Sequence, residues 1–376
     1  MPIYLDHNAT TPLSPAVVEA MMPYMTGIYG NPSSVHRFGR LTRDALEQAR
    51  VQVAQCVGAE ANQVIFTSGG TEANNLAIKG SLLNQALASI AVSPIEHACV
   101  LEPAKAMAKL GWKLDLLVVD DQGRVVTDHL KSTMTAETRF VSVMAANNET
   151  GVLQDLAHLV EVSKSVNPDV LFHSDACQML GKLPISFKQL GLDLMSVSSH
   201  KLYGPQGAGA LIVSRSIDLQ PQILGGGQEK GLRSGTENLA AIVGFGRAAE
   251  LATETQQARK EHVQKLQQQL VDSLIDQPGV TVFSSQAERL PNTVQFSVQG
   301  IDGETLLMQL DRKGFAVSSG SACDSGRTDP SHVLLAMGID DMIAKGAIRV
   351  SFGEQNTSEQ IVQFIDVLAQ IRQQFN

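Results

Sequence analysis

The sequence lacks the features that mark secreted and disulfide-stabilised proteins. Its four cysteines, Cys56, Cys99, Cys177 and Cys323, are widely spaced and include no Cys-x-x-Cys. This pattern is neither a disulfide framework nor a zinc-site spacing, so no metal is expected. The N-terminus has no basic segment followed by an apolar one, so no secretory signal is predicted. We therefore expect a reducing, cytoplasmic location, where an unusual cysteine is a reactive thiol.

Long apolar runs and excess positive charge are also absent. The most apolar stretch, residues 78–100, is broken by charged and polar residues and by proline, whereas a membrane span needs about 20 mostly apolar residues. The formal net charge is −9, so direct binding to nucleic acid or to a membrane is not expected. A chain of 376 residues with 43% hydrophobic content fits a globular protein of two or three domains.

Short apolar runs alternate with helical patterns through the first two-thirds of the chain. Strands are predicted at 63–67, 89–92, 114–119, 140–145, 170–174, 194–197 and 210–213, and helices at 71–77 and 156–165. This alternation predicts an α/β fold with a mostly parallel sheet flanked by helices. A long helix follows from about 237 towards 275, then a strand at 294–298, a helix at 304–313 and a final helix from 358. These later elements predict a smaller α+β domain.

Two charged residues follow predicted strands. Lys201 comes directly after the strand at 194–197, in a loop that ends in Gly-Pro, and Asp175 ends the strand at 170–174. Ligands of α/β proteins bind at the carboxyl ends of strands. A lysine there can carry a cofactor as a Schiff base, and a buried carboxylate can pair with a protonated pyridine nitrogen. Considered alone, Lys201 is more simply interpreted as a solvated loop residue, and Asp175 as a helix N-cap.

A glycine-rich turn and a histidine add to this pattern. Residues 68–72, Ser-Gly-Gly-Thr-Glu, join a strand to a helix, and such a turn offers free N–H groups and a helix dipole to a phosphate. The turn matches neither the Rossmann fingerprint nor the P-loop. His97 opens a predicted helix, where its ring could stack on a flat cofactor and move protons. An isolated histidine is more often an ordinary surface or core residue.

Two further residues have unusual surroundings. Cys323 lies in Ser-Ser-Gly-Ser-Ala-Cys-Asp-Ser-Gly, a small, polar segment that favours an accessible, reactive thiol over a buried structural one. Asp324 beside it disfavours the thiolate, so a proton acceptor at the site would have to activate the thiol. Arg349 lies in an apolar, strand-like run and requires an anion, which is either a ligand carboxylate or an internal Asp or Glu.

Taken together, these segments resemble the NifS/IscS-type cysteine desulfurases, within the class V branch of fold-type I pyridoxal-phosphate enzymes. The resemblance covers nearly the whole chain in order. Its motifs stand at residues 4–12, 30–34, 67–72, 147–151, 173–178, 198–201 and 233–238, and the Cys323 loop and Arg349 complete it. It implies a large cofactor-binding domain over 15–255 and a small domain, formed by 1–14 and 256–376, that carries the Cys323 loop.

The resemblance also implies residue roles. The cofactor is pyridoxal 5'-phosphate, the substrate is L-cysteine, and the products are L-alanine and a persulfide on Cys323 that passes to a sulfur-acceptor protein. Family enzymes are homodimers. Lys201 is implied to attach the cofactor covalently and to transfer protons, and His97 to stack on the cofactor ring. Asp175 is implied to pair with the pyridine nitrogen, and Gln178 to form a hydrogen bond to the phenolic oxygen. Phosphate binding is implied for Gly70, Thr71, Ser198, His200 and the partner subunit's Thr236, and substrate-carboxylate binding for Asn148 and Arg349.

Three departures from the family pattern leave alternatives open. Cys177 stands where a small non-thiol residue is expected, which means either packing or a redox liability, and Asp324 stands where Ser or Thr is more familiar. The chain ends soon after its last helix, which brings it closer to the NifS-like branch. A selenocysteine lyase, a class V aminotransferase and a non-catalytic sulfur-transfer scaffold are the alternatives. The sequence names neither the sulfur acceptor nor its pathway, be it iron–sulfur cluster assembly, tRNA thiolation or DNA sulfur modification.

Overall fold

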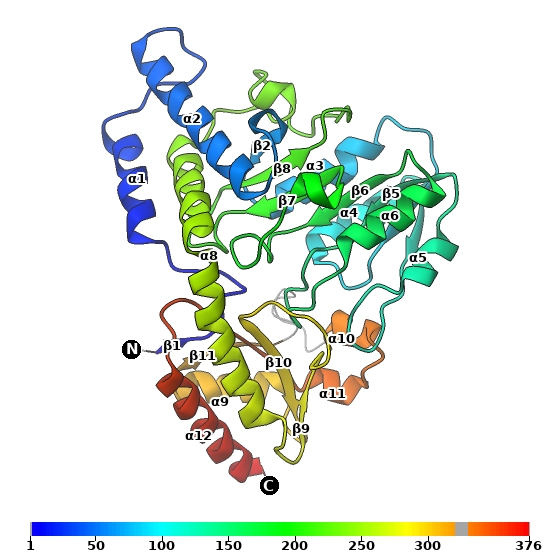
Figure 1. Ribbon diagram of the computed structural model, residues 1–376, viewed down its shortest axis with the longest axis vertical. Helices are drawn as coiled ribbons and strands as arrows, with labels where there is room; N and C mark the ends of the chain where they lie inside the picture. Colours follow the sequence, from blue (N-terminus) through cyan, green and yellow to red (C-terminus); the bar gives the residue numbers. More distant parts are fainter. Residues whose placement is uncertain (1, 320–329, 376) are drawn as a thin grey trace.

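The computed structural model describes residues 2–319 and 330–375. Its central element is a seven-stranded sheet in the order β2-β8-β7-β6-β5-β3-β4 (Figure 1). In this sheet β8 runs opposite to the other six strands, so the predicted mostly parallel sheet is confirmed. The strands are β2 (Val64–Thr67), β3 (Ser89–Val92), β4 (Lys113–Leu116), β5 (Thr138–Ser142), β6 (Leu171–Asp175), β7 (Leu194–Ser198) and β8 (Gly209–Val213).

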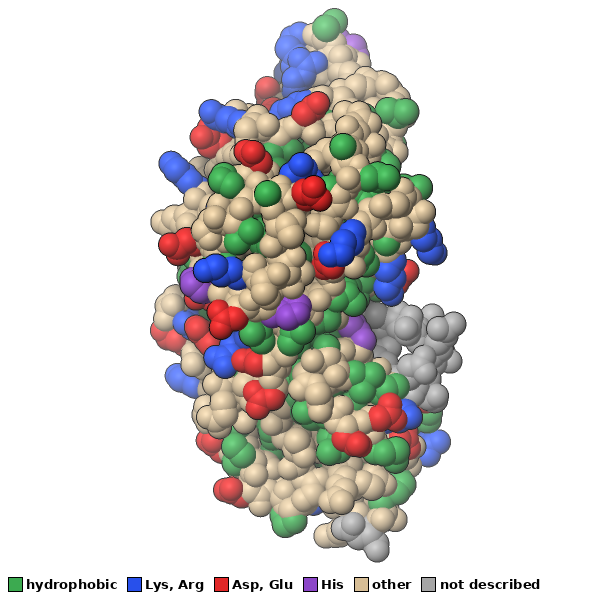
Figure 2. All heavy atoms as spheres, turned by 90° about the vertical axis from the view of Figure 1, so that its right-hand side faces the viewer, with side chains coloured by type: hydrophobic (Ala, Val, Ile, Leu, Met, Phe, Trp, Pro, Cys, Tyr) green, Lys and Arg blue, Asp and Glu red, His purple; other side chains and the backbone are tan. Residues whose placement is uncertain are grey.

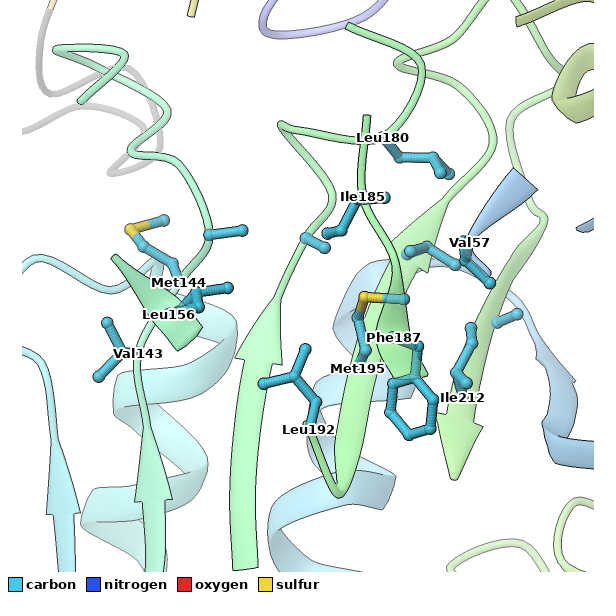
Figure 3. Packing of buried hydrophobic residues seen from close by; sticks show 14 of the residues in the cluster. Val57, Val143, Met144, Leu156, Leu180, Ile185, Phe187, Leu192, Met195 and Ile212 are labelled. Carbon is cyan, nitrogen blue, oxygen red and sulfur yellow. The ribbon is translucent and has the colours of Figure 1, made fainter. Parts of the chain in front are cut away.

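Both faces of this sheet are covered, which explains why its strands read as continuous apolar runs. Successive side chains of a strand point to opposite faces. Met195 and Ile212 thus enter one hydrophobic cluster with Phe187 (Figure 3), whereas their neighbours Leu194 and Leu211 enter another. The first cluster is closed by α1 (Pro15–Thr26), α2 (Arg37–Cys56), α5 (Thr127–Thr133), α6 (Leu156–Val166), α7 (Phe187–Leu190) and the first half of α8 (Leu239–Leu274), and the second by α3 (Gly70–Leu82) and α4 (Ala98–Lys109).

A second core lies at the other end of the molecule, in the lower part of Figure 1. It is built on an antiparallel sheet in the order β12-β13-β10-β9, with a short parallel pair β1-β11 beside it. Its elements are β1 (Ile3–Tyr4), β9 (Val280–Val282), β10 (Thr293–Val298), α9 (Gly303–Arg312), β11 (Phe315–Ala316), β12 (Ser318–Ser319), β13 (Ala347–Ser351) and α12 (Ser358–Phe375). Two short helices of the same part of the chain, α10 (His332–Ala336) and α11 (Asp341–Lys345), place their buried side chains in the first cluster instead. The 3-10 turns Ala61–Gln63 and Glu229–Gly231 complete the described elements.

Helix α8 joins the two cores, because Phe245 packs in the first cluster and Leu266 and Leu270 pack in the second. Leu5 also belongs to the second core, so the N-terminal segment packs with the last third of the chain. The division into 15–255 against 1–14 with 256–376 stays a prediction.

Two strands begin and end earlier than predicted. The apolar run after Leu116 leaves the sheet, and Val119 bridges to Val125 instead. Similarly, Val143 to Ala145 are buried beyond the last ladder pair of β5. These apolar residues past the carboxyl ends of the strands pack in the first hydrophobic cluster, and local patterning does not distinguish them from the strand. Among the described residues, no helix is long and apolar enough to cross a membrane.

Candidate active site

A cavity of about 320 Å³ opens at the carboxyl ends of β6 and β7. Parallel strands all deliver their following loops to this edge of the sheet, so residues far apart in sequence converge here. The lining combines loops of the large sheet with β12 and β13 of the small one. It consists of Asn8, Ala9, Gly70, Thr71, His97, Cys99, Met144, Asn148, Asp175, Cys177, Gln178, Ser198, His200, Lys201, Ser319 and Arg349.

One end of the cavity is suited to an anion. Helix α3 begins there at Gly70, so the free N–H groups of its first turn and its dipole favour negative charge. A Cβ on Gly70 would lie 2.6 Å from the sulfur of Cys177, so no larger residue fits that turn unless the thiol moves. The hydroxyl of Ser198 is buried with no partner, and Thr71 and His200 line the same cavity.

Asp175 supplies the buried negative charge of the site. Its Oδ1 accepts a hydrogen bond from the Cys177 amide at 2.9 Å, and its Oδ2 accepts one from the Asn74 side chain at 2.7 Å. Burial alone would raise the pKa of Asp175, but these donors and the positive charge of Lys201 lower the pKa below its ordinary value. The carboxylate is therefore ionised, although only 6% of the residue is exposed. It is a built-in counter-charge for a cationic ligand atom.

His97 is oriented by its role as the N-cap of α4. Its Nδ1 accepts the main-chain N–H of Cys99 at 3.1 Å and lies 2.9 Å from the Cys99 sulfur. A main-chain N–H can only donate, so Nδ1 carries no proton and the neutral ring keeps its proton on Nε2. Burial, and then the charges of Lys201 and His332 against that of Asp175, lower the pKa of His97. The ring is thus neutral near pH 7.

Lys201 lies in a tight turn that follows β7. Tyr203, two residues later, has φ = 64°, a left-handed conformation that is uncommon outside glycine. The turn is held by Thr11, whose hydroxyl donates to the His200 carbonyl at 2.8 Å and accepts the Tyr203 amide at 2.8 Å. Strained backbone of this kind persists only when its surroundings hold it. Here the N-terminal segment fixes the loop from which Lys201 enters the cavity.

Arg349 reaches the cavity from β13 and has internal partners. Its guanidinium pairs with Asp6 at 2.6 Å and donates to the Asn148 carbonyl at 2.9 Å, while its Nε is buried with no partner. The internal carboxylate left open by the sequence is therefore present. Arg349 still lines the cavity, and a guanidinium has five N–H groups, so donors remain for a second anion.

The remaining predicted residues have different positions. Gln178 lines the cavity, and its amide nitrogen donates to the Asn8 carbonyl at 3.0 Å. Thr236 is exposed and does not line the cavity of its own chain. Its predicted partner-subunit role needs a second chain and stays a prediction. Cys323 and Asp324 lie outside the described residues.

Sequence reasoning missed several residues of the site. Asn74 could have been found, because it lies one turn after Gly70 on the buried side of α3. Asn8 lies in one of the family motifs but had no predicted role, and no sequence pattern indicated Cys99.

Burial and the charge of Asp175 raise the pKa of Cys177 well above its ordinary value and that of Cys99 to about 12, so both thiols stay protonated. For Cys177, contact with the Gly70 turn favours the packing interpretation. No cluster of His, Cys, Asp or Glu among the described residues could hold a metal ion.

Fold and cavity together define an α/β protein with a site for an anionic ligand at the carboxyl ends of its parallel strands. The chain belongs to the aminotransferase class-V family, whose model matches residues 3–364. It is 42% identical to the cysteine desulfurase IscS of Dictyoglomus turgidum over 98% of this chain and 94% of that protein. A NifS-like protein of known structure superposes with a TM-score of 0.93 at 37% identity, covering 99% of this chain and all of that one. The structure of SspA in complex with cysteine gives a TM-score of 0.82 at 30% identity, over 94% and 100%.

The cofactor of this family is pyridoxal 5'-phosphate, and the cavity fits it. The α3 N-terminus and the unpartnered Ser198 hydroxyl suit its phosphate, and ionised Asp175 suits its pyridinium nitrogen. Lys201 and His97 line the same space.

Proposed function

We propose that this protein is a pyridoxal-phosphate-dependent cysteine desulfurase, which converts L-cysteine to L-alanine and passes the sulfur to an acceptor. The observation that carries the proposal is the convergence of Lys201, ionised Asp175 and Arg349 on one cavity. A primary amine, a buried counter-charge and a carboxylate-binding fork are the groups needed to process an α-amino acid on this cofactor. The cysteine desulfurases among the relatives narrow the substrate to cysteine.

Each described residue has a separate task. The bound cofactor supplies an electron sink for the substrate carbon. Lys201 attaches the cofactor and moves a proton at its Nζ, while Asp175 keeps the ring nitrogen protonated by its negative charge. Thr71, Ser198 and His200, with the Gly70 turn, hold the phosphate. Arg349 and Asn148 hold the substrate carboxylate, and Arg349 is pre-oriented by Asp6.

His97 acts as a stacking platform and as a proton donor through Nε2. Because Nδ1 is occupied by the N-cap hydrogen bond, Nε2 is the nitrogen that can exchange a proton with the site. In the neutral ring this atom already holds a proton, which it can deliver to the carbon that loses sulfur while it takes another from the Lys201 ammonium, so that no imidazolate is left.

Cys323 takes the sulfur. Its thiolate attacks the sulfur of bound cysteine, a new S–S bond forms, and the Cβ–S bond breaks with its electron pair left on carbon. A proton from Lys201 or His97 then completes alanine. The outer sulfur of the Cys323 persulfide is transferred to a sulfur-acceptor protein in the cytoplasm. Iron–sulfur cluster assembly is among the processes that use this sulfur.

The protein works as a homodimer. Exposed apolar side chains gather on α1, on the start of α2 and between them, and they include Met25 (64% exposed), Tyr29 (79%), Val35 (83%) and Phe38 (50%). A contiguous apolar patch of this kind is typical of a protein interface. In the homodimer, Thr236 would reach the phosphate site of the partner subunit. On the face seen in Figure 2, acidic and basic side chains are interspersed, which does not favour a nucleic-acid partner.

The test combines colour with product analysis. Purified protein should be yellow, should bleach with borohydride and should form alanine from cysteine. C323S should keep the colour and lose alanine formation from cysteine, while the matched thiol control C56S should keep both. A colourless protein that cofactor does not reconstitute would favour the scaffold alternative. Full activity of C323S would contradict the persulfide mechanism, and activity of that variant on selenocysteine alone would identify a selenocysteine lyase.

A further inference from the structure

Lys182 is a partly buried amine beside the cofactor cavity to which the proposed mechanism gives no task. Its Nζ lies 2.6 Å from Asn8 Oδ1 and 2.9 Å from Gln178 Oε1. Within the described parts of the chain it forms no ion pair, and the charges that act on it are those of Lys201 and Arg349. Burial and these two cations lower the pKa of Lys182 well below its ordinary value. Burial of an amine costs free energy unless hydrogen bonds within the protein replace those it made to water.

The contacts of Lys182 decide how two side-chain amides are turned. Nζ donates to the side-chain oxygens of Asn8 and Gln178; an ammonium can only donate, and a neutral amine has the two N–H groups that these two contacts need. At the other end of each amide stands a main-chain carbonyl, which can only accept. Gln178 Nε2 donates to the Asn8 carbonyl at 3.0 Å, and Asn8 Nδ2 donates to the Asn148 carbonyl at 3.2 Å. Obligate donors and acceptors therefore fix both amides in one orientation.

This orientation has a consequence for the cavity. Gln178 Nε2 donates one hydrogen to the Asn8 carbonyl, and its second hydrogen is available to a ligand in the cavity that Gln178 lines. A reversed amide would present an acceptor there instead. The same network reaches the substrate side, because Arg349 donates to the Asn148 carbonyl that also accepts from Asn8. Asn8 is 1% exposed and also contacts Thr293 and Asn292 on the small sheet.

We infer that Lys182 is a positioning residue that makes Gln178 present an N–H donor to the cofactor ring, through a buried Lys182–Asn8–Gln178 network. The inference rests on the proposed function, since the ligand it concerns is the ring oxygen of pyridoxal phosphate. Loss of the Lys182 contact leaves Gln178 Oε1 unsatisfied and weakens the N–H on the same amide, because linked hydrogen bonds strengthen one another.

The experiment is a pH titration of the visible absorption of the holoenzyme. K182M, which places an apolar side chain of similar length at this position, removes the contact that holds the Gln178 N–H towards the anionic ring oxygen, so this oxygen is less well stabilised. The midpoint of the absorption change should rise by about half a pH unit or more, because removal of a nearby cation or donor raises a pKa. In the Q178A background, K182M should add little further shift, since Lys182 acts through Gln178.

Two variants separate positioning from simple stability. K182R keeps a donor, and a cavity of about 40 Å³ beside Lys182 can take its extra atoms, so its midpoint should return towards the wild-type value. K164M is the matched control, because Lys164 bonds Asp193 and the Val170 carbonyl at the opposite edge of the sheet, and its midpoint should not move. A lowered melting temperature of K182M with an unchanged midpoint would overturn the inference. A wild-type protein that binds no cofactor would instead overturn the proposed function.

Discussion

The two halves of the active site are built in different ways. The cofactor half comes from loops that follow neighbouring strands of one parallel sheet, with Asp175 after β6 and Lys201 after β7. The substrate half is formed where the small sheet meets the N-terminal segment, with Arg349 from β13 held by Asp6. The first half depends on local chain direction and the second on contacts between residues more than 300 positions apart. Changes in the first half should therefore alter the state of the bound cofactor, and changes in the second half should alter substrate affinity.

The largest expected effect is that of D175N in the cofactor half. The amide keeps the shape but loses the negative charge that holds the ring nitrogen protonated, so kcat should fall by about 10²–10⁴-fold. The absorption spectrum of the bound cofactor should change as well. The measurement is steady-state kinetics with spectra of the holoenzyme.

The control for D175N is D169N, on an exposed turn near the other end of β6. It should leave both kcat and spectrum unaltered. An unchanged spectrum in D175N would break the proposed pairing of Asp175 with the cofactor.

In the substrate half, R349K should raise KM by about 10–100-fold, because a lysine keeps the charge but loses the planar fork that binds a carboxylate through two bonds. The cofactor spectrum and its pH midpoint should stay as in wild type. Kinetics over a range of cysteine concentrations, with spectra of the same samples, provide the measurement. A spectral change equal to that of D175N would abolish the distinction between the two halves.

Stability should depend on pH through buried histidines of both halves. Burial lowers the pKa of His173, His200 and His7 to about 4, and His173 is fully buried within β6 of the large sheet. Each is neutral in the folded protein, whereas the unfolded chain takes up a proton near pH 6.5. The stabilisation is therefore complete above about pH 6.5 and is lost as the pH falls towards 4, by about 3 kcal/mol for fully buried His173.

Urea denaturation at pH 7, 6 and 5 measures this loss. H173Q should reduce the slope of unfolding free energy against pH by about 1.4 kcal/mol per unit, the value for one proton. An identical slope in H173Q and wild type would show that another group dominates. H158Q, on an exposed surface of α6, is the control whose slope should not differ.

The smallest expected effect belongs to C177A. The thiol is buried and protonated, so its removal should cost about 1 kcal/mol of stability and change kcat less than about threefold. Chemical denaturation and kinetics of the variant check both values. A much larger loss of activity would mean that Cys177 acts in the chemistry and not only in packing against the Gly70 turn.

Sequence and tertiary structure determine different parts of this protein. The apolar strands, the loops that end them and the turn at Gly70 were predictable because each follows from neighbouring residues, and parallel strands must bring those loops to one edge. The motifs also led to the cofactor. Only the tertiary structure decided that Arg349 pairs with Asp6, that Cys177 limits the space at Gly70, and that Lys182 orients Gln178 through Asn8. These contacts join segments that meet only after both cores have packed, so no local pattern in the chain could specify them.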